Sequence, residues 1–585
     1  MRHLQTGLFA AVFGLFVATG CGGSDDKGKS ESAGGSDAMG GADDAGAGEG
    51  GATSGQGEGG ASESDGGSAA ADAGSSGAGP TDGDPCQGVP TTGECVSQSQ
   101  TRLCVVQTGN GTTSVVTRDC RSFEHCEQSD DGARCVLDTG ACIPGQSECL
   151  DAKSGRACSD AAAWETTVCA VACKESAAGA FCVPAGATKA YTGKLVYQAF
   201  GPYSDYSDWG PQSQDLPGEG VLVLSMLGTD ILDATLVGAD GAFTLNVPAS
   251  PAGAGQLTFL LLHPDPIAAT AEFGIFDPDV PQGDVPAGQK LDGQVWFWSA
   301  KVSDYPSGTI RLDENHGSGA MHVYEWLRYT HQASTDFYGA APHTLVAWMH
   351  LGTEWSCGTC FLSLPAEVQS FPFDTQMFIS ASAQDRAYWS DAVTAHEIGH
   401  FTMFSYGTAS KEGGQHCVGN TTLAGQAWSE GWGTGFSSIV RDSPIYYDKQ
   451  QGSMFWIDLG KRQYTNHPWQ RPDPKAGLLQ DIDENEVAAM LWGLAQSPDI
   501  GPSKTLAGLK APSVTVPNFA RGYTRHAWQM QNCERYGIVD TGESAPIFAD
   551  YLDGLACAKV PSAAIDSVTN PSTSFPYPSK APICP

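Results

Sequence analysis

Basic residues and long apolar runs are both scarce in this sequence of 585 residues. It contains 31 Lys and Arg against 66 Asp and Glu, which gives a formal net charge of −35 at pH 7. Nucleic acids and anionic membrane surfaces attract basic proteins, so this balance argues against both as partners. No uninterrupted apolar run reaches about 18 residues, and we therefore expect no membrane-spanning helix. The chain is too long for one hydrophobic core, so we expect several domains.

One apolar run stands near the start of the sequence, at residues 7–19. It follows Arg2 and has the length of a signal-peptide core rather than of a membrane span. The run ends in Ala-Thr-Gly before Cys21, which resembles the lipobox of bacterial lipoproteins. That resemblance implies removal of residues 1–20 and acylation of Cys21, and an ordinary cleaved signal is the alternative. Because Gly22 is not the Asp that often retains lipoproteins at the inner membrane, we expect an exported protein held at the outer membrane or cell surface by lipid only.

Aromatic residues are absent from residues 21–85, which consist mainly of Gly, Ser, Ala and Asp. Such a segment cannot bury enough apolar surface to offset the entropy that it would lose on ordering. We therefore expect a disordered tether before the first folded domain.

Cysteines are concentrated in the next segment, which holds twelve of the 19 in the chain. They divide into two sets of six with similar spacings, which indicates a tandem repeat of small modules at residues 86–140 and 141–186. Cores this small need covalent support, so we expect three disulfides in each module. The segment lacks paired CxxC motifs, which makes a metal site the weaker interpretation. The twelve are Cys86, Cys95, Cys104, Cys120, Cys126, Cys135, Cys142, Cys149, Cys158, Cys169, Cys173 and Cys182.

Residues 187–308 contain β-branched and aromatic runs divided by Gly and Pro, a pattern typical of strands. Asp240-Gly241 within this segment predicts a tight hairpin. We expect a small antiparallel β-sandwich, for which a structural role is the default. The runs are at residues 194–200, 221–227, 235–247, 257–263 and 295–298.

Residues 309–585 combine strand and helix signals, which predicts an α+β catalytic domain. The chain is thus expected to be multidomain, with a linker, two disulfide-rich modules, a β-sandwich and this domain. Strands are expected at residues 344–350, 360–364 and 377–380. Helices are expected at residues 320–332, 390–405, 426–441, 485–495 and 519–531.

An HExxH motif, HEIGH, lies in the helix expected at residues 390–405. Its two histidines, His396 and His400, are four residues apart and project from one face of a helix, so both can bind one metal ion. Glu397 then lies beside the ion, where it can take a proton from a metal-bound water. Residues 388–393 supply an N-cap candidate for this helix, and Gly407 is its expected stop.

A catalytic zinc ion needs a third protein ligand and an open position for water. The longer HExxHxxGxxH pattern fails, because Met403 and Tyr406 occupy its later positions. The candidate is Glu430, on the helix expected at residues 426–441. Small residues, among them Gly433, share its face and would let this helix approach the motif helix closely. An acid that interacts with the helix dipole is the alternative interpretation of Glu430.

HEIGH followed by WSEGW is similar to the gluzincin class of zinc metallopeptidases, whose third ligand is a downstream glutamate. The resemblance covers about residues 310–500. It implies one catalytic zinc ion held by His396, His400 and Glu430. It also implies hydrolysis of peptide bonds by zinc-bound water, with Glu397 as the general base.

The sequence departs from two main branches of that class. It lacks the Gly-x-Met-Glu-Asn strand of the aminopeptidase-N branch, and the gap from His400 to Glu430 is longer than in that branch. Thr434 stands where the thermolysin-like branch has an Asp. Residues 485–494 resemble a late helix of fungalysin-like gluzincins. These comparisons favour an endopeptidase over an aminopeptidase.

The resemblance also implies a Tyr or His that donates a hydrogen bond to the oxyanion. Tyr447, Tyr523 and His526 lie in the right part of the chain, and the choice among them stays open. For each of them a structural role is the alternative. His416, next to Cys417, is not assigned to the zinc ion.

Six cysteines remain in this domain, and their even number predicts three disulfides. A CxxC motif among them is interpreted as part of a disulfide rather than as a redox or metal motif. The six are Cys357, Cys360, Cys417, Cys533, Cys557 and Cys584.

These features together predict a secreted, lipid-anchored zinc peptidase that acts on a protein or peptide. The main alternative is a non-catalytic surface binding lipoprotein with a structural or vestigial zinc site. A third is zinc-dependent hydrolysis of a non-peptide amide. The presence of Glu397 favours catalysis, because a structural zinc site needs no base.

Overall fold

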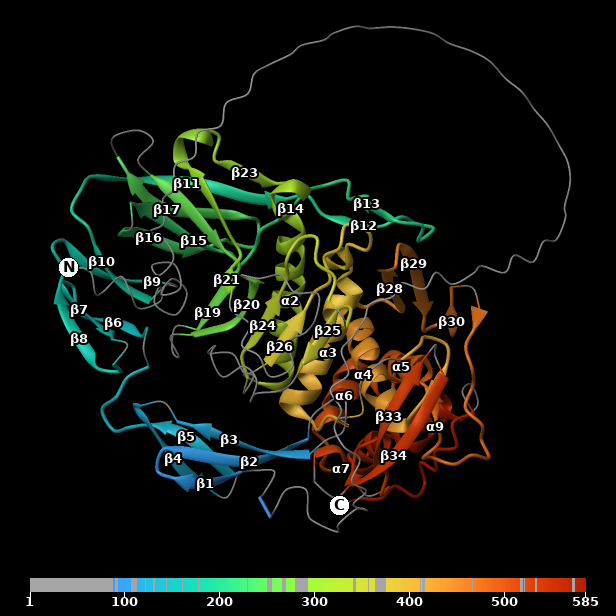
Figure 1. Ribbon diagram of the computed structural model, residues 1–585. Coiled ribbons are helices and arrows are strands. Elements are labelled where there is room, and N and C mark those ends of the chain that lie inside the picture. The colour runs from blue at the N-terminus through green and yellow to red at the C-terminus, as the bar shows by residue number, and fades with distance from the viewer. Residues whose placement is uncertain are drawn as a thin grey trace, which may run out of the picture. The chain divides into compact units, whose positions relative to one another are not determined.

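The computed structural model describes residues 88–584 apart from internal gaps, the longest of which are 279–292 and 363–374 (Figure 1). The expected signal peptide, Cys21 and the tether lie outside the described residues. Among the helices that the structure describes, none is long and apolar enough to cross a membrane.

Each Cys-rich module consists of a three-stranded antiparallel sheet followed by a two-stranded hairpin. In the first module these are β1 (Glu94–Ser97), β2 (Gln100–Val106) and β3 (Thr113–Asp119), then β4 (Glu124–Ser129) and β5 (Gly132–Leu137). In the second they are β6 (Ser147–Asp151), β7 (Ser154–Cys158) and β8 (Trp164–Val168), then β9 (Ala172–Ser176) and β10 (Gly179–Val183).

The disulfides join corresponding cysteines in the two modules. In both, the second cysteine of the set pairs with the fifth and the fourth with the sixth. In the second module the first also pairs with the third, whereas Cys86 of the first module lies outside the described residues. Shared strand order and shared pairing support the tandem repeat. The bonds are Cys95–Cys126, Cys120–Cys135, Cys142–Cys158, Cys149–Cys173 and Cys169–Cys182.

Two sheets pack face to face after these modules. In one, β11 (Thr188–Tyr197) pairs with β14 (Leu216–Pro217), β17 (Ala242–Pro248) and β23 (Thr309–Leu312). The other has the order β16 (Asp230–Leu236), β15 (Leu222–Leu227), β18 (Gln256–Leu260) and β22 (Phe297–Lys301). Side chains from both sheets, such as Leu195, Phe243 and Phe259, belong to one buried apolar cluster.

The prediction of a β-hairpin at Asp240-Gly241 is wrong. A turn does form there, with Gly241 at φ 83° and its N–H donating to the Gly238 carbonyl at 2.8 Å. However, β16 before the turn pairs with β15, and β17 after it pairs with β11. The turn therefore carries the chain from one sheet of the sandwich to the other.

The boundary expected between residues 308 and 309 does not separate two folds. β20 (Thr270–Pro278) pairs in parallel with β24 (Leu345–Trp348), and β23 pairs in parallel with β11. The sheet that results has the order β19–β20–β24–β26–β25, with β21 beside β20. Strands from both sides of the expected boundary therefore share sheets. The remaining bounds are β19 (Leu262–Asp265), β21 (Gly293–Val295), β25 (Cys360–Leu362) and β26 (Thr375–Phe378).

Four long helices follow the first strands of this sheet and match four of the expected helices. Helix α3 packs against α2 and α4, and α4 also packs against α5 (Figure 1). Large aromatic side chains such as Trp389, Trp428 and Trp432 are fully buried among them. The helices are α2 (Ser318–Tyr338), α3 (Asp391–Tyr406), α4 (Ala424–Arg441) and α5 (Glu484–Gln496).

The prediction of a helix at residues 519–531 is wrong. That segment forms β33 (Thr524–Gln531), which pairs with β34 (Glu534–Ser544). Gly522 has φ 64°, a left-handed conformation that interrupts a right-handed helix. Shorter helices complete this end of the chain: α6 (Gly501–Ala507), α7 (Pro512–Thr515), α8 (Phe548–Cys557) and α9 (Ser562–Thr569).

Cysteines of the C-terminal region are bonded as expected where the structure describes them. Cys357 pairs with Cys360 and Cys557 with Cys584, and Cys417 is also in a disulfide. Cys533 lies outside the described residues. The interpretation of the CxxC motif as a disulfide is confirmed.

Candidate metal centre

Helix α3 begins and ends within one residue of the bounds predicted from the sequence. The hydroxyl of Ser390 accepts a hydrogen bond from the Val393 N–H at 3.1 Å and caps the first turn. The helix ends before Gly407, whose N–H donates to the Met403 carbonyl. Between these ends the HExxH motif occupies the middle of a rigid helix that is packed on both sides.

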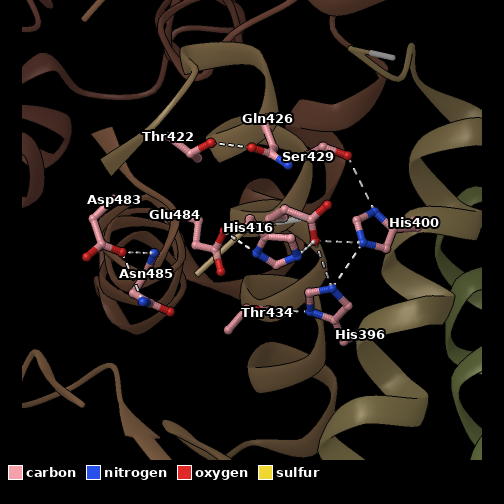
Figure 2. Close-up of polar contacts among 11 residues, drawn as sticks. His396, His400, His416, Thr422, Gln426, Ser429, Thr434, Asp483, Glu484 and Asn485 are labelled. Carbon is pink, nitrogen blue, oxygen red and sulfur yellow. Dashed lines mark hydrogen bonds and ion pairs between the residues drawn. The ribbon is translucent and has the colours of Figure 1, made fainter. Parts of the chain in front are cut away.

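Three side chains of α3 and α4 converge, those of His396, His400 and Glu430, whose ligand atoms lie within 4.8 Å of one another. Figure 2 shows the two histidines side by side. The Nε2 atoms of His396 and His400 lie 3.0 Å apart. Glu430 Oε2 lies 3.3 Å from the first of these nitrogens and 3.2 Å from the second. Ligand atoms at 2.0–2.1 Å from a tetrahedral zinc ion would lie about 3.3 Å from one another. The donor set and its spacing therefore fit zinc.

The outer nitrogens of both histidines face hydroxyl groups of α4. His396 Nδ1 lies 3.0 Å from Thr434 Oγ1, and His400 Nδ1 lies 3.4 Å from Ser429 Oγ. A hydroxyl oxygen can accept a hydrogen bond from Nδ1–H, which leaves the lone pair of Nε2 directed at the centre. At position 434 a hydroxyl thus orients the histidine where the thermolysin-like pattern has a carboxylate.

The backbones of α3 and α4 touch where the two helices cross. A Cβ added at Gly399 would lie 2.7 Å from Gly433 Cα, and one added at Gly433 would lie 2.9 Å from His396 Cε1. The indole N–H of Trp432 donates to the Gly399 carbonyl at 3.1 Å and ties the helices together at this point. The small residues beside Glu430 therefore permit the close approach that the sequence suggested.

Glu412, on the connection between α3 and α4, fixes the start of α4. Its carboxylate accepts a hydrogen bond from the Gln426 N–H at 3.1 Å, in the first turn of that helix. It also accepts from the Tyr523 hydroxyl at 3.0 Å and from the His526 backbone N–H at 2.7 Å. The first turn of α4 is thereby joined to β33, one turn before Glu430.

Glu397 is buried beside the three converging side chains, with 5% of its surface exposed. Burial raises the pKa of its carboxyl to about 8, and the nearby His400 opposes this shift. No hydrogen bond to this carboxylate is found among the described residues. A cation at the centre would lower this pKa, so Glu397 could both accept and release a proton near neutral pH.

The three residues considered as oxyanion donors are held by other groups. The Tyr447 hydroxyl donates to Asp391 at the start of α3. The Tyr523 hydroxyl donates to Glu412, and His526 Nδ1 lies 3.6 Å from the same carboxylate. In the described part of the chain, none of the three contacts the converging ligands.

Among the described residues, Tyr446 is a tyrosine whose ring lies beside His396, and it was not among the candidates predicted from the sequence. Its ring centroid is 5.8 Å from that of His396. Burial, together with the charges of Asp448 and Glu397, raises the pKa of Tyr446 well above its usual value, so its hydroxyl keeps its proton. Neighbouring residues on β28 (Ile445–Gln450) point to opposite faces, which separates Tyr446 from Tyr447. The sequence shows that alternation but not which of the two tyrosines lies beside His396.

One known family resembles this part of the chain. Residues 346–534 match the family described as the Mycolysin C-terminal domain. The match begins in β24, ends at the start of β34, and includes the converging ligands and Glu397. No curated protein matches the chain. Over about a third of its length the chain is therefore similar to a family of zinc-dependent peptidases.

Proposed function

We propose that this protein is an exported zinc-dependent peptidase. His396, His400 and Glu430 would hold the ion. The observation that carries the proposal is the convergence of three ligand atoms at the spacing that zinc requires. Beside them lies the buried carboxylate of Glu397, which makes no hydrogen bond with the residues that the structure describes. Structural zinc sites usually use four protein ligands and need no base, whereas among the described residues three ligands converge here. Similarity to the Mycolysin C-terminal domain supports a peptide bond as the target.

A bound zinc ion would supply Lewis acidity, which polarises a carbonyl group and lowers the pKa of a water ligand towards about 7. Thr434 and Ser429 hold the two histidines in the orientation for binding. Glu397 takes the proton from the attacking water and passes it to the leaving amine. The hydroxyl of Tyr446 donates a hydrogen bond to the carbonyl oxygen as that oxygen becomes negative.

The proposal extends to substrate and location. The substrate is a protein or peptide, and the absence of a Gly-x-Met-Glu-Asn sequence favours cleavage within chains. The many disulfides agree with export to an oxidising compartment. Lipid on Cys21 would hold the protein at the outer membrane or cell surface, with residues 21–85 as a tether. Incorporation of labelled palmitate into the parent chain, and its loss in Cys21→Ser, tests the anchor.

The first test of the activity compares the parent chain with Glu397→Gln in hydrolysis of quenched fluorescent casein. Zinc content is measured for both. We expect about one zinc ion in each and a rate about 10²–10⁴-fold lower in the variant, because the general base is lost. Glu354→Gln changes an exposed acid and should leave both values unchanged.

Two results would contradict the proposal in different ways. A folded parent chain that binds no zinc would contradict the metal centre itself. Stoichiometric zinc without hydrolysis of casein or of a peptide library would contradict the peptidase and favour a binding lipoprotein.

A further inference from the structure

The connection between α3 and α4 brings a third histidine to the metal centre. This connection, whose length sets the sequence apart from the aminopeptidase-N branch, carries Glu412 and then His416. Figure 2 shows His416 between Glu484, in the first turn of α5, and His400. Side chains from α3, α4, α5 and this connection thus meet at one place.

His416 contacts a carboxylate with each of its ring nitrogens. Nδ1 lies 2.7 Å from Glu484 Oε2, and Nε2 lies 3.6 Å from Glu430 Oε2. The Glu484 side chain is 7% exposed and that of Glu430 is 12% exposed, so water screens neither contact strongly. The Nδ1 contact with Glu484 is within hydrogen-bond distance, whereas the Nε2 contact with Glu430 is longer than a hydrogen bond and is electrostatic.

Glu430 lacks the kind of support that the other two ligands have. The hydroxyls of Thr434 and Ser429 orient His396 and His400. Among the described residues, the Glu430 carboxylate contacts one polar side chain besides the two histidines, and that side chain is His416. A metal-binding carboxylate without such a contact can rotate away, and outer partners of ligands commonly change metal affinity by about 10–100-fold.

We propose that His416 is a positioning residue that Glu484 holds in place and that in turn holds the Glu430 carboxylate towards the ion. This inference rests on the proposed zinc centre and adds a residue to it. The long connection then has a defined task, because Glu412 anchors it to α4 and β33 while His416 supports the ligand one turn further along α4.

His416 is not itself placed as a ligand. The ligand atoms of His396, His400 and Glu430 lie within 4.8 Å of one another, and His416 is not part of this group. Its Nε2 faces the same Glu430 oxygen that the two histidines contact. A positioning role therefore predicts two histidine ligands on the zinc ion, and a ligand role predicts three.

The test measures zinc affinity of the full chain by competition with a chelator. We expect His416→Phe, which removes both nitrogens and keeps a flat ring, to weaken zinc binding by about 10–100-fold. His416→Gln keeps one donor and should recover part of that loss. Glu484→Ala should weaken zinc binding as much as His416→Phe does. The double variant should bind zinc about as tightly as either single variant, because Glu484 acts through His416.

Two controls separate positioning from general damage. His350 pairs with Asp277 at 2.6 Å elsewhere in the fold, so His350→Phe removes a similar contact and should leave zinc affinity unchanged. Unfolding of the zinc-free proteins shows whether each variant folds. X-ray absorption of the zinc-loaded parent counts its histidine ligands.

Unchanged zinc affinity in folded His416→Phe would overturn the inference, and so would a count of three histidine ligands in the parent. Weakened binding in His416→Phe without any recovery in His416→Gln would also contradict it. Zinc binding that follows the expected order in a chain without peptidase activity would uphold the positioning role and contradict the proposed function.

Discussion

Gly433 faces His396 across the contact between α3 and α4, where a methyl group would lie 2.9 Å from the imidazole ring. Alanine favours a helix over glycine by about 1 kcal/mol, so an exposed position would gain from the substitution. Here the added carbon must displace a metal ligand or separate two helices. We expect Gly433→Ala to lower the free energy of unfolding by about 1–3 kcal/mol and to weaken zinc binding.

Gly435 provides the matched control on the same helix. A Cβ there would contact Leu491 of α5 rather than a ligand. Gly435→Ala should therefore change stability, measured by denaturant unfolding, with little change in zinc affinity, measured by chelator competition. Equal zinc affinities in Gly433→Ala and the parent would show that the crossing tolerates a side chain.

The residues that converge between α3 and α4 are those that sequence spacing could predict. Four-residue spacing puts His396 and His400 on one face of a helix whatever the fold, and the small residues around Glu430 marked its helix for close packing. Tyr446 and His416 could not be found in this way. The position of Tyr446 depends on which face of β28 turns towards His396, and that of His416 on a connection whose path is set by its contact with Glu484.

At the scale of elements, local periodicity predicted α2, α3, α4 and α5 because each buries an apolar face over several turns. It failed where the choice of a pairing partner decides the structure, whether that partner is near or distant in sequence. β33 is a strand because it pairs with β34. The turn at Asp240-Gly241 connects two sheets because β16 before it pairs with β15 and β17 after it pairs with β11. Strand pairing of this kind is a property of the fold rather than of the segment.

Glu412 joins two such elements, and its substitution should weaken both. Its carboxylate accepts hydrogen bonds from the N–H groups of Gln426 and His526 on different oxygens. In Glu412→Gln only one side-chain oxygen remains to accept, so a buried N–H loses its partner. We expect the free energy of unfolding to fall by about 1–3 kcal/mol, as measured by denaturant titration. Glu354→Gln is the exposed control, and equal stability of the two variants would argue against the capping role.

At the scale of the whole molecule, shared sheets make the sandwich and the helical region interdependent. β20 pairs with β24 from Phe273 opposite Leu345 to Phe276 opposite Trp348, and β23 adds to β11. A chain of residues 309–585 would leave β24 without this neighbour. We expect that fragment to show no cooperative unfolding and to aggregate, whereas residues 187–585 unfold cooperatively. A cooperative transition in the shorter fragment, followed by circular dichroism, would contradict this dependence.

The buried ring of His331 on α2 makes the stability of this packing depend on pH. Its ring lies 4.9 Å from that of Phe273 on β20 and 5.9 Å from that of Phe401 on α3. Burial, with a smaller contribution from His263, lowers the pKa of His331 to about 4, below its usual value of 6.5. The unfolded chain therefore binds a proton that the folded chain resists. The contribution of His331 to stability is complete above about pH 6.5 and is lost as the pH falls towards 4.

The difference in unfolding free energy between the parent and His331→Phe isolates this effect, because other titrating groups are common to both. We expect that difference to shift by about 3 kcal/mol between pH 7 and pH 4, in the direction that favours the variant in acid. Denaturant unfolding at a series of pH values measures it. A difference that does not vary with pH would show that the unfolded and folded chains protonate this histidine alike.

The pairing of β20 with β24 also constrains the order in which the chain can mature. β20 ends at Pro278, and its partner begins at Leu345, after the sandwich strands and all of α2. As the chain emerges into the compartment where it folds, this edge of β20 stays unpaired until β24 follows, and unpaired strand edges can pair with other chains. The HExxH helix follows β24 in the chain. A chain that folds in this order therefore exposes the unpaired edge of β20, with its risk of aggregation, before it can bind a metal ion.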